Sequence, residues 1–262
     1  MTKAEEDLES VDGKSIAVWD LRTELPDAVL SDWARHFRQN YCLDKDLDAM
    51  RDGTKLSRAE YLRQLLFPSD VIAPGPSVRS GDFAELLISD FLQYALGHWV
   101  PRLKYAEKAS PNESVKGIDV LAFDLKKSGE SCAEDRIIMF EVKAHMAGKS
   151  APEQLQDAID HSSKDYLRLS YTLNKVKQMY RVRSDFGAVH TVSRFQARAD
   201  NPFGLTFGAV AVLSEHIYDS AVLVQASSVE HSNSSDLELM VVRGADLMRF
   251  VHEIYRRAAD EA

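Results

Sequence analysis

Hydrophobic residues in the middle of the chain form two short runs, and together these runs predict a β-hairpin. Residues 118–125 (IDVLAFDL) and 136–144 (RIIMFEVKA) are apolar and rich in β-branched and aromatic side chains, and a glycine and two serines lie between them. In a symmetric hairpin, Asp119 lies opposite Glu141. Because side chains alternate along a strand, Glu141 and Lys143 share a face. The pattern therefore places two carboxylates and one lysine on a single face.

The remaining hairpin residues are apolar on both faces, which is typical of a central strand pair covered on both sides. Leu121, Phe123, Ile137 and Met139 share the face of the charges, and the other face carries Ile118, Val120, Ile138, Phe140 and Val142. An unpaired charge in such a place is costly, so these acids need partners. A divalent cation is a suitable partner, because Mg²⁺ prefers carboxylate oxygens and keeps several waters. This arrangement is typical of phosphodiester hydrolysis, with the metal held by two acids and a lysine beside it.

A simpler interpretation of the same residues stays open. In it, Asp119 and Glu141 are solvated side chains of an edge strand, and Lys143 is an ordinary ion-pair partner. Against it, Glu141-Val142-Lys143 is the only Glu-x-Lys triplet in the chain, and it ends the most apolar strand candidate. The motif in this structural context favours a site.

The rest of the chain alternates between helical and strand patterns. Apolar residues at helical spacing predict helices over 30–42, 56–67, 81–97, 152–182 and 245–259. Short apolar runs predict strands over 15–21, 99–105, 208–214, 221–225 and 237–242. Residues 1–14 resemble a disordered segment, and 184–204 a long loop. A stretch rich in Pro, Gly and Ser predicts two parts: a mixed, mostly helical N-terminal region, 1–75, and a catalytic core, 76–262.

Glu85, on the predicted helix 81–97, has two interpretations. Asp82 as N-cap and Glu85 three positions later would form a capping box. Glu85 also shares a helix face with Ile88 and Leu92, so it points toward the core and can face the metal site. The two interpretations are compatible.

Composition excludes several classes of protein. The hydrophobic share of 45% and the charged share of 28% are ordinary for a globular protein, and no apolar run is long enough for a membrane helix. The polar start and the two cysteines, which lie far apart, indicate a cytoplasmic protein without a disulfide framework. Nucleotide-binding glycine motifs and the serine-hydrolase motif are absent.

The net charge of −9 is unusual for a protein that binds DNA alone, because phosphate neutralisation supplies most non-specific affinity. The charge is uneven, however, since residues 161–200 carry eight Lys and Arg against three Asp. Six of these bases form the candidate nucleic-acid surface: Lys164, Arg168, Lys175, Lys177, Arg181 and Arg183. The alternative is an ordinary solvated helix face.

Gly117-x-Asp119, followed by Glu141-x-Lys143 on the next strand, resembles the motif of the PD-(D/E)xK, or restriction-endonuclease-like, nuclease superfamily. The resemblance implies an α/β fold with an αβββαβ core, in which helices flank a mixed central sheet. It also implies DNA cleavage with Mg²⁺, or alternatively Mn²⁺. Asp119 and Glu141 then bind the metal, Lys143 stabilises the attacking hydroxide or the transition state, and Glu85 supports the site. The proline that the family's motif has before the Asp is absent here.

A narrower resemblance covers most of the chain. Together with the hairpin, the segments DWARHFRQNYC, DGTKLSRAEYLRQLLFP, SGDFAELLISDFL and VVRGADLMRFVHEIY are similar to the HamA family, the nuclease subunits of the Hachiman anti-phage defence system. This resemblance implies a HamB-like helicase partner that restrains the nuclease until it meets foreign or damaged DNA. Two alternatives stay open: a stand-alone restriction or repair endonuclease, and a catalytically silent nuclease-fold module that only binds.

Overall fold

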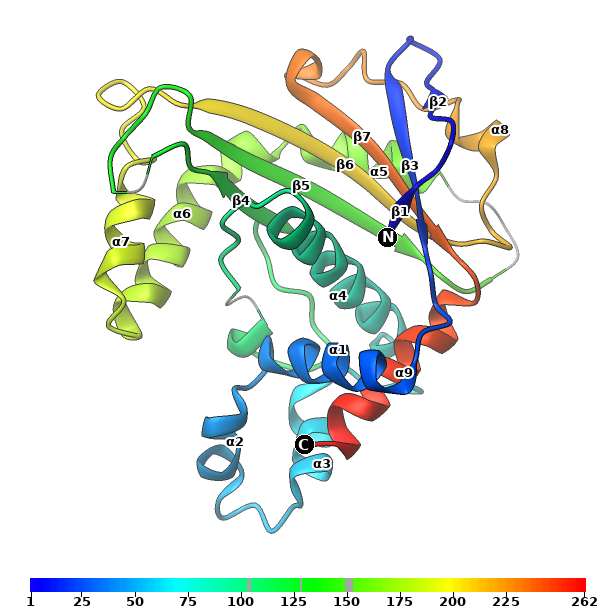
Figure 1. Ribbon diagram of the computed structural model, residues 1–262, viewed down its shortest axis with the longest axis vertical. Helices are drawn as coiled ribbons and strands as arrows, with labels where there is room; N and C mark the ends of the chain where they lie inside the picture. Colours follow the sequence, from blue (N-terminus) through cyan, green and yellow to red (C-terminus); the bar gives the residue numbers. More distant parts are fainter. Residues whose placement is uncertain (103–104, 128, 149–152) are drawn as a thin grey trace.

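The structure is a computed structural model that describes residues 1–102, 105–127, 129–148 and 153–262. Within these residues one seven-stranded mixed sheet has the order β1-β3-β7-β6-β5-β4, and β2 pairs with β3 (Figure 1). The strands are β1 (Thr2–Lys3), β2 (Leu8–Glu9), β3 (Ser15–Leu21), β4 (Val120–Asp124), β5 (Arg136–His145), β6 (Gly204–Ser214) and β7 (Leu237–Gly244). Strands β3, β7, β6 and β5 run parallel, whereas β4 runs antiparallel to β5.

Helices cover both faces of this sheet. The helices are α1 (Asp27–Gln39), α2 (Asp44–Arg51), α3 (Arg58–Tyr61), α4 (Gly75–Asp90), α5 (Gln154–Ser162), α6 (Asp165–Val182), α7 (Phe186–Ser193), α8 (Ser220–Leu223) and α9 (Leu247–Asp260). Shorter turns of π-helix (Leu62–Leu66, Phe91–Ala95) and 3₁₀-helix (Tyr105–Glu107, Ser234–Asp236) complete them. The predicted fold class, an α/β protein with a mixed sheet flanked by helices, is confirmed. No helix of the described part is long and apolar enough to cross a bilayer.

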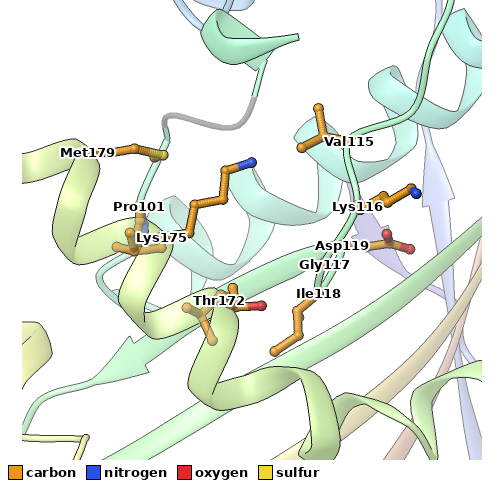
Figure 2. A pocket seen from close by; sticks show the side chains of 11 residues that line it. Pro101, Val115, Lys116, Gly117, Ile118, Asp119, Thr172, Lys175 and Met179 are labelled. Carbon is orange, nitrogen blue, oxygen red and sulfur yellow. The ribbon is translucent and has the colours of Figure 1, made fainter. Parts of the chain in front are cut away.

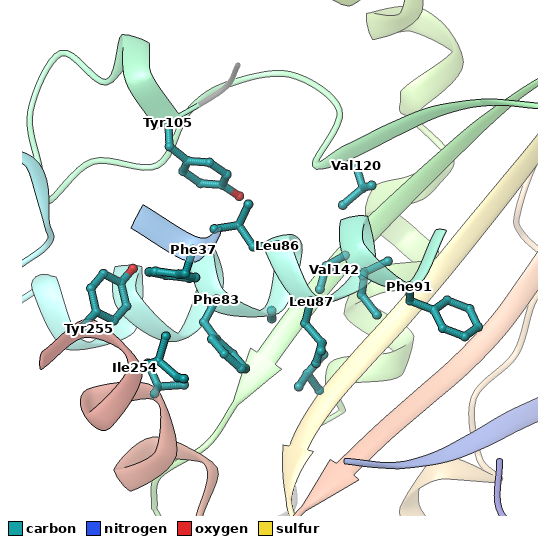
Figure 3. Close-up of a cluster of buried hydrophobic side chains, with 14 of the residues drawn as sticks. Phe37, Phe83, Leu86, Leu87, Phe91, Tyr105, Val120, Val142, Ile254 and Tyr255 are labelled. Carbon is teal, nitrogen blue, oxygen red and sulfur yellow. The ribbon is translucent and has the colours of Figure 1, made fainter. Parts of the chain in front are cut away.

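Two apolar cores lie against the sheet, one on each face. Helices α1, α4 and α9 bury the first core, which also includes Val120 and Val142 of the hairpin; within it the ring of Phe37 packs against those of Phe83 and Tyr255 (Figure 3). Helices α5 and α6 bury the second core against the opposite face of the same strands. Both faces of the hairpin are therefore covered, as its sequence predicts, but only β5 is central, because β4 is the edge strand of the described sheet.

The predicted hairpin is confirmed as β4 and β5. The register pairs Val120 with Phe140, so its continuation by one residue places Asp119 opposite Glu141. Leu121, Phe123, Ile137 and Met139 share the second core, and Val120, Ile138, Phe140 and Val142 share the first. Ile118 was expected with Val120 but lies in the second core. It precedes the regular strand, where strict alternation does not apply.

Several predicted elements in the N-terminal half are corrected by the structure. Residues 1–14 are not disordered, because β1 and β2 pair with β3. The helix predicted over 81–97 begins at Gly75 and ends, after a π-helical turn, before Gly97, whose φ is +75°. The strand predicted over 99–105 is reduced to one bridge between Trp99 and Phe123, and residues 103–104 lie outside the described residues.

Three predictions in the C-terminal half are also wrong. The single helix expected over 152–182 is two helices, α5 and α6, separated at Ser163 and Lys164; residue 152 lies outside the described residues. Helix α7 occupies part of the loop expected over 184–204, and its first turn is capped by Asp185, which accepts a hydrogen bond from the Ala188 N–H. The strand expected over 221–225 is helix α8, because Asp219 caps it in the same way.

Residues from the predicted N-terminal region, 1–75, take part in the same sheet as the rest of the chain. Strand β3 pairs with β7 from Ile16–Leu239 to Leu21–Gly244, and α1 packs against α9. The division at residue 75 stays a prediction, and a truncation that tests it is given below.

Candidate active site

The hairpin brings together the three charged residues that its sequence singled out. Lys143 Nζ donates a hydrogen bond of 2.6 Å to Glu141 Oε1, and the Val142 N–H donates one of 3.1 Å to Asp119 Oδ2. Glu141 is only 3% exposed. Gly117, with a φ of +131°, lets the chain turn into the position of Asp119. The predicted proximity of Asp119, Glu141 and Lys143 is therefore confirmed, while their function is not tested by geometry alone.

Helices α5 and α6 add a second set of polar side chains from the other side. His161 Nδ1 lies 3.3 Å from Glu141 Oε1, and Arg168 Nη1 lies 3.5 Å from Glu141 Oε2. The same Arg168 nitrogen lies 3.1 Å from Asp165 Oδ1. Because α5 packs directly on β5 and β6, its C-terminal end and the start of α6 are held over Glu141.

Asp165 is one of the site residues that sequence reasoning missed. Its side chain is fully buried, and burial, with the nearby Glu141 carboxylate next in size, raises the pKa of Asp165 to about 8. Asp119 raises this pKa further, whereas Arg168 lowers it. A signal for it was present in the sequence, because Ser162-Ser163-Lys164-Asp165 is typical of a helix start. The assignment of 152–182 to one helix hid that start.

Glu85 lies inside α4 and not at its N-terminus, so the capping-box interpretation is wrong. Its Oε2 accepts a hydrogen bond of 2.6 Å from the Tyr105 hydroxyl. Burial, together with Glu85 and more weakly Asp82 and Asp119, raises the pKa of Tyr105 well above its ordinary value. Tyr105 thus stands within electrostatic reach of both Glu85 and Asp119.

Asp82, the expected N-cap, does not cap the helix but takes part in a buried polar network. It is buried, forms an ion pair with Lys108, and accepts a hydrogen bond of 2.7 Å from the Tyr41 hydroxyl. The Tyr41 and Tyr255 hydroxyl oxygens lie 2.6 Å apart. This network links the segment that follows α1 to α4 and α9 at the first core.

A narrow slot of about 60 Å³ opens beside Asp119. Figure 2 shows Asp119 and Lys116 on one side of it and Thr172 and Lys175 of α6 on the other. The slot has room for one or two water molecules. Lys116 was not among the predicted site residues, although it precedes the Gly-x-Asp motif directly.

The six predicted nucleic-acid-binding bases do not share one environment. Arg168 contacts Glu141, and Lys175 lines the slot beside Asp119. Lys177 Nζ donates a hydrogen bond of 2.7 Å to Gln196. Lys164, Arg181 and Arg183 are exposed. Two of the six therefore lie at the site itself, and nucleic-acid binding by the set stays a prediction.

The donor chemistry of the site fits a hard divalent cation such as Mg²⁺. Asp119 and Glu141 supply carboxylate oxygens, and one buried oxygen of Asp165 has no hydrogen-bond partner in the described part of the chain. Among the described residues, no three His, Cys, Asp or Glu side chains are already arranged to hold one ion. Such an ion would thus be held by Asp119 and Glu141 together with waters, which is usual for Mg²⁺.

A family model described as HamA matches residues 1–258 of the chain. No curated protein and no solved structure matches it.

Proposed function

The chain belongs to the HamA family, and from this premise we propose that it is a metal-dependent DNA nuclease with Asp119, Glu141 and Lys143 at its active site. Membership of this family suggests a component of the Hachiman defence system. The finer proposal, phosphodiester hydrolysis, is supported by one observation above all. A lysine and two acids meet at the end of a covered hairpin, with Lys143 Nζ 2.6 Å from the nearly buried Glu141.

Each of these side chains has a different role in the proposed reaction. Asp119 and Glu141 would hold Mg²⁺, and an ion there would supply Lewis acidity toward a phosphate oxygen and toward a bound water. Lys143 is half-buried beside them, and its compact charge stabilises negative charge that develops on the attacking hydroxide and the phosphoryl oxygens. Glu85 supports this arrangement through Tyr105 from the opposite side.

We further propose that a HamB-like helicase subunit brings DNA to this nuclease and holds it in check. The net charge of −9 supports a division of labour, because such a chain has little affinity of its own for a polyanion. Lys175 and Arg168 give the site a local positive charge that can receive one strand once a partner delivers it.

The test is cleavage of plasmid and linear DNA by purified protein, with Mg²⁺ or with EDTA, alone and with the helicase partner. Glu141→Gln and Asp119→Asn are expected to lower the rate at least ~100-fold, because each removes a charge from the metal site. Glu238→Gln, an exposed glutamate on β7, is the matched control and should cut like the wild type.

The outcomes separate the proposal from its alternatives. Cutting of one defined sequence without a partner would favour a stand-alone restriction or repair enzyme. Absence of metal-dependent cutting, alone and with the helicase, would favour a silent binding module and contradict the proposal. Cutting only with the helicase present would support a restrained subunit.

A further inference from the structure

Asp165 is the first residue of α6, and the environment of its carboxylate is unusual. The side chain is 0% exposed. Its Oδ1 accepts a hydrogen bond of 3.1 Å from Arg168 Nη1, whereas its Oδ2 is buried and has no hydrogen-bond partner in the described part of the chain. Buried carboxylate oxygens are nearly always hydrogen-bonded, because an unsatisfied one is costly. An oxygen of this kind calls for an explanation.

Helix capping does not explain why Oδ2 of Asp165 has no hydrogen-bond partner in the described part of the chain. An Asp at a helix start usually accepts hydrogen bonds from the first backbone N–H groups. In α6 no side chain caps the N-terminus, and the hydrogen bond to Asp165 comes from a guanidinium. The side chain is therefore not needed to satisfy the backbone of its own helix.

The residues around Asp165 explain this unpartnered oxygen better than helix capping does. Arg168 Nη1 links Asp165 to Glu141, since it lies 3.1 Å from one carboxylate and 3.5 Å from the other. The charges of Glu141 and Asp119 both act on Asp165. Lys143 and His161 contact Glu141 from the remaining directions. Asp165 thus faces the two proposed metal-binding acids from the α6 side.

We propose that Asp165 is a third acid of this site, whose unpartnered oxygen accepts a hydrogen bond from a water that stays with the bound ion. This inference rests on the proposed function and deepens it. Mg²⁺ keeps several waters when two carboxylates hold it, and those waters need acceptors. The buried Oδ2 of Asp165 supplies such an acceptor, while Arg168 binds the other oxygen of this carboxylate and also contacts Glu141. Outer partners of this kind orient the inner ones and tune the affinity for the metal.

The test is a titration of the purified protein with Mn²⁺, followed by the electron paramagnetic resonance of the free ion. Asp165→Asn keeps the size of the side chain and removes its charge. It is expected to weaken Mn²⁺ binding about 10- to 100-fold and to raise the Mg²⁺ concentration for half-maximal cleavage by a similar factor. Asp157→Asn, an exposed acid on α5, is the matched control and should bind Mn²⁺ like the wild type.

Two further measurements distinguish a failure of the proposed metal site from a failure of the proposed role of Asp165. A cooperative thermal transition of Asp165→Asn shows that this variant is folded. If the transition is lost, the titration is carried out with Asp165→Ser instead. If the wild type binds no Mn²⁺, or if Glu141→Gln binds it unchanged, the proposed metal site itself fails. If Glu141→Gln loses Mn²⁺ while the Asp165 variant binds it like the wild type, only the role of Asp165 is overturned.

Discussion

At the scale of single residues, the site is a balance of charges around one buried carboxylate. Glu141 lies between Lys143, His161 and Arg168, each within 3.5 Å of one of its oxygens. Buried charges are tolerated only with such partners. Asp165 shares Arg168 with Glu141, so the two acids compete for the same cation. Protonation of Asp165 relieves that competition in the metal-free protein.

This competition predicts how Asp165→Asn changes stability with pH. Between the ordinary pKa of an aspartate and about 8, folded Asp165 keeps a proton that the unfolded chain has lost. Stability therefore falls as pH rises through this window, by up to about 1.4 kcal/mol per pH unit from this group. Asp165→Asn removes the slope, so its advantage over the wild type should grow from pH 5 to pH 8 and then level off. Urea unfolding in metal-free buffer measures it, and parallel profiles would show that Asp165 is not buried as described.

Residue patterns predicted Asp119, Glu141 and Lys143, because alternation along two strands is a local rule that packing does not change. They did not reveal Asp165, His161 or Lys116 as site residues. The positions of His161 and Asp165 depend on where α5 ends and α6 begins and on how α5 packs on β5 and β6. Lys116 precedes β4 and reaches the site only because α6 lies across the slot from it. The charge of Arg168 was noticed, but its partner was not.

At the scale of elements, the hairpin depends on the close fit of β6, the strand that pairs with β5. Gly208 in β6 pairs with Phe140, and a Cβ at position 208 would lie 2.1 Å from a ring carbon of that phenylalanine. Phe140 is buried and directly precedes Glu141. A glycine is needed here for space and not for an unusual backbone angle.

Gly208→Ala should therefore destabilise the protein and disturb the site together. Overpacking of this kind costs about 1–3 kcal/mol, because the buried ring of Phe140 would have to shift to make room for the added Cβ. Gly81→Ala is the control, since a Cβ there meets nothing within 4 Å and alanine favours the helix. Chemical denaturation should show a loss for Gly208→Ala and no loss for Gly81→Ala. Equal stability of the two variants would contradict this account of β6.

Long elements whose apolar residues repeat with one clear period could be predicted from the sequence, whereas short elements could not. The strand 15–21 and the helix over 245–259 match β3 and α9 within two residues, because their apolar positions repeat over their full length. The run AVLVQ suits a strand by composition, yet Asp219 caps it as the short helix α8. Four residues carry too little periodicity to decide between the two.

At the scale of the whole molecule, segments near the two ends of the chain pack side by side, both in the sheet and in the helices that cover it. Strand β3 lies beside β7, and α1 packs on α9, so residues from the first forty and the last thirty share the first core (Figure 1). The hydroxyls of Tyr41 and Tyr255 meet in this core. Removal of the N-terminal region would expose one edge of β7 and the apolar face of α9.

A fragment of residues 76–262 is therefore expected not to fold by itself, although the sequence predicts a separate core there. The matched control is residues 15–262, which lacks the two-residue strands β1 and β2 and the turn after them but keeps β3 and α1. Circular dichroism during heating should show a cooperative transition for 15–262 and none for 76–262. A cooperative transition of the shorter fragment would restore the predicted division at residue 75.

The central claim, a metal-dependent nuclease centred on Glu141, is tested most directly by one comparison of rates. Wild-type protein and Glu141→Gln, each mixed with the helicase partner, are given the same DNA at saturating Mg²⁺. We expect the variant to cut at least ~100-fold more slowly while its thermal unfolding stays cooperative. Equal cutting by the two proteins would contradict the claim.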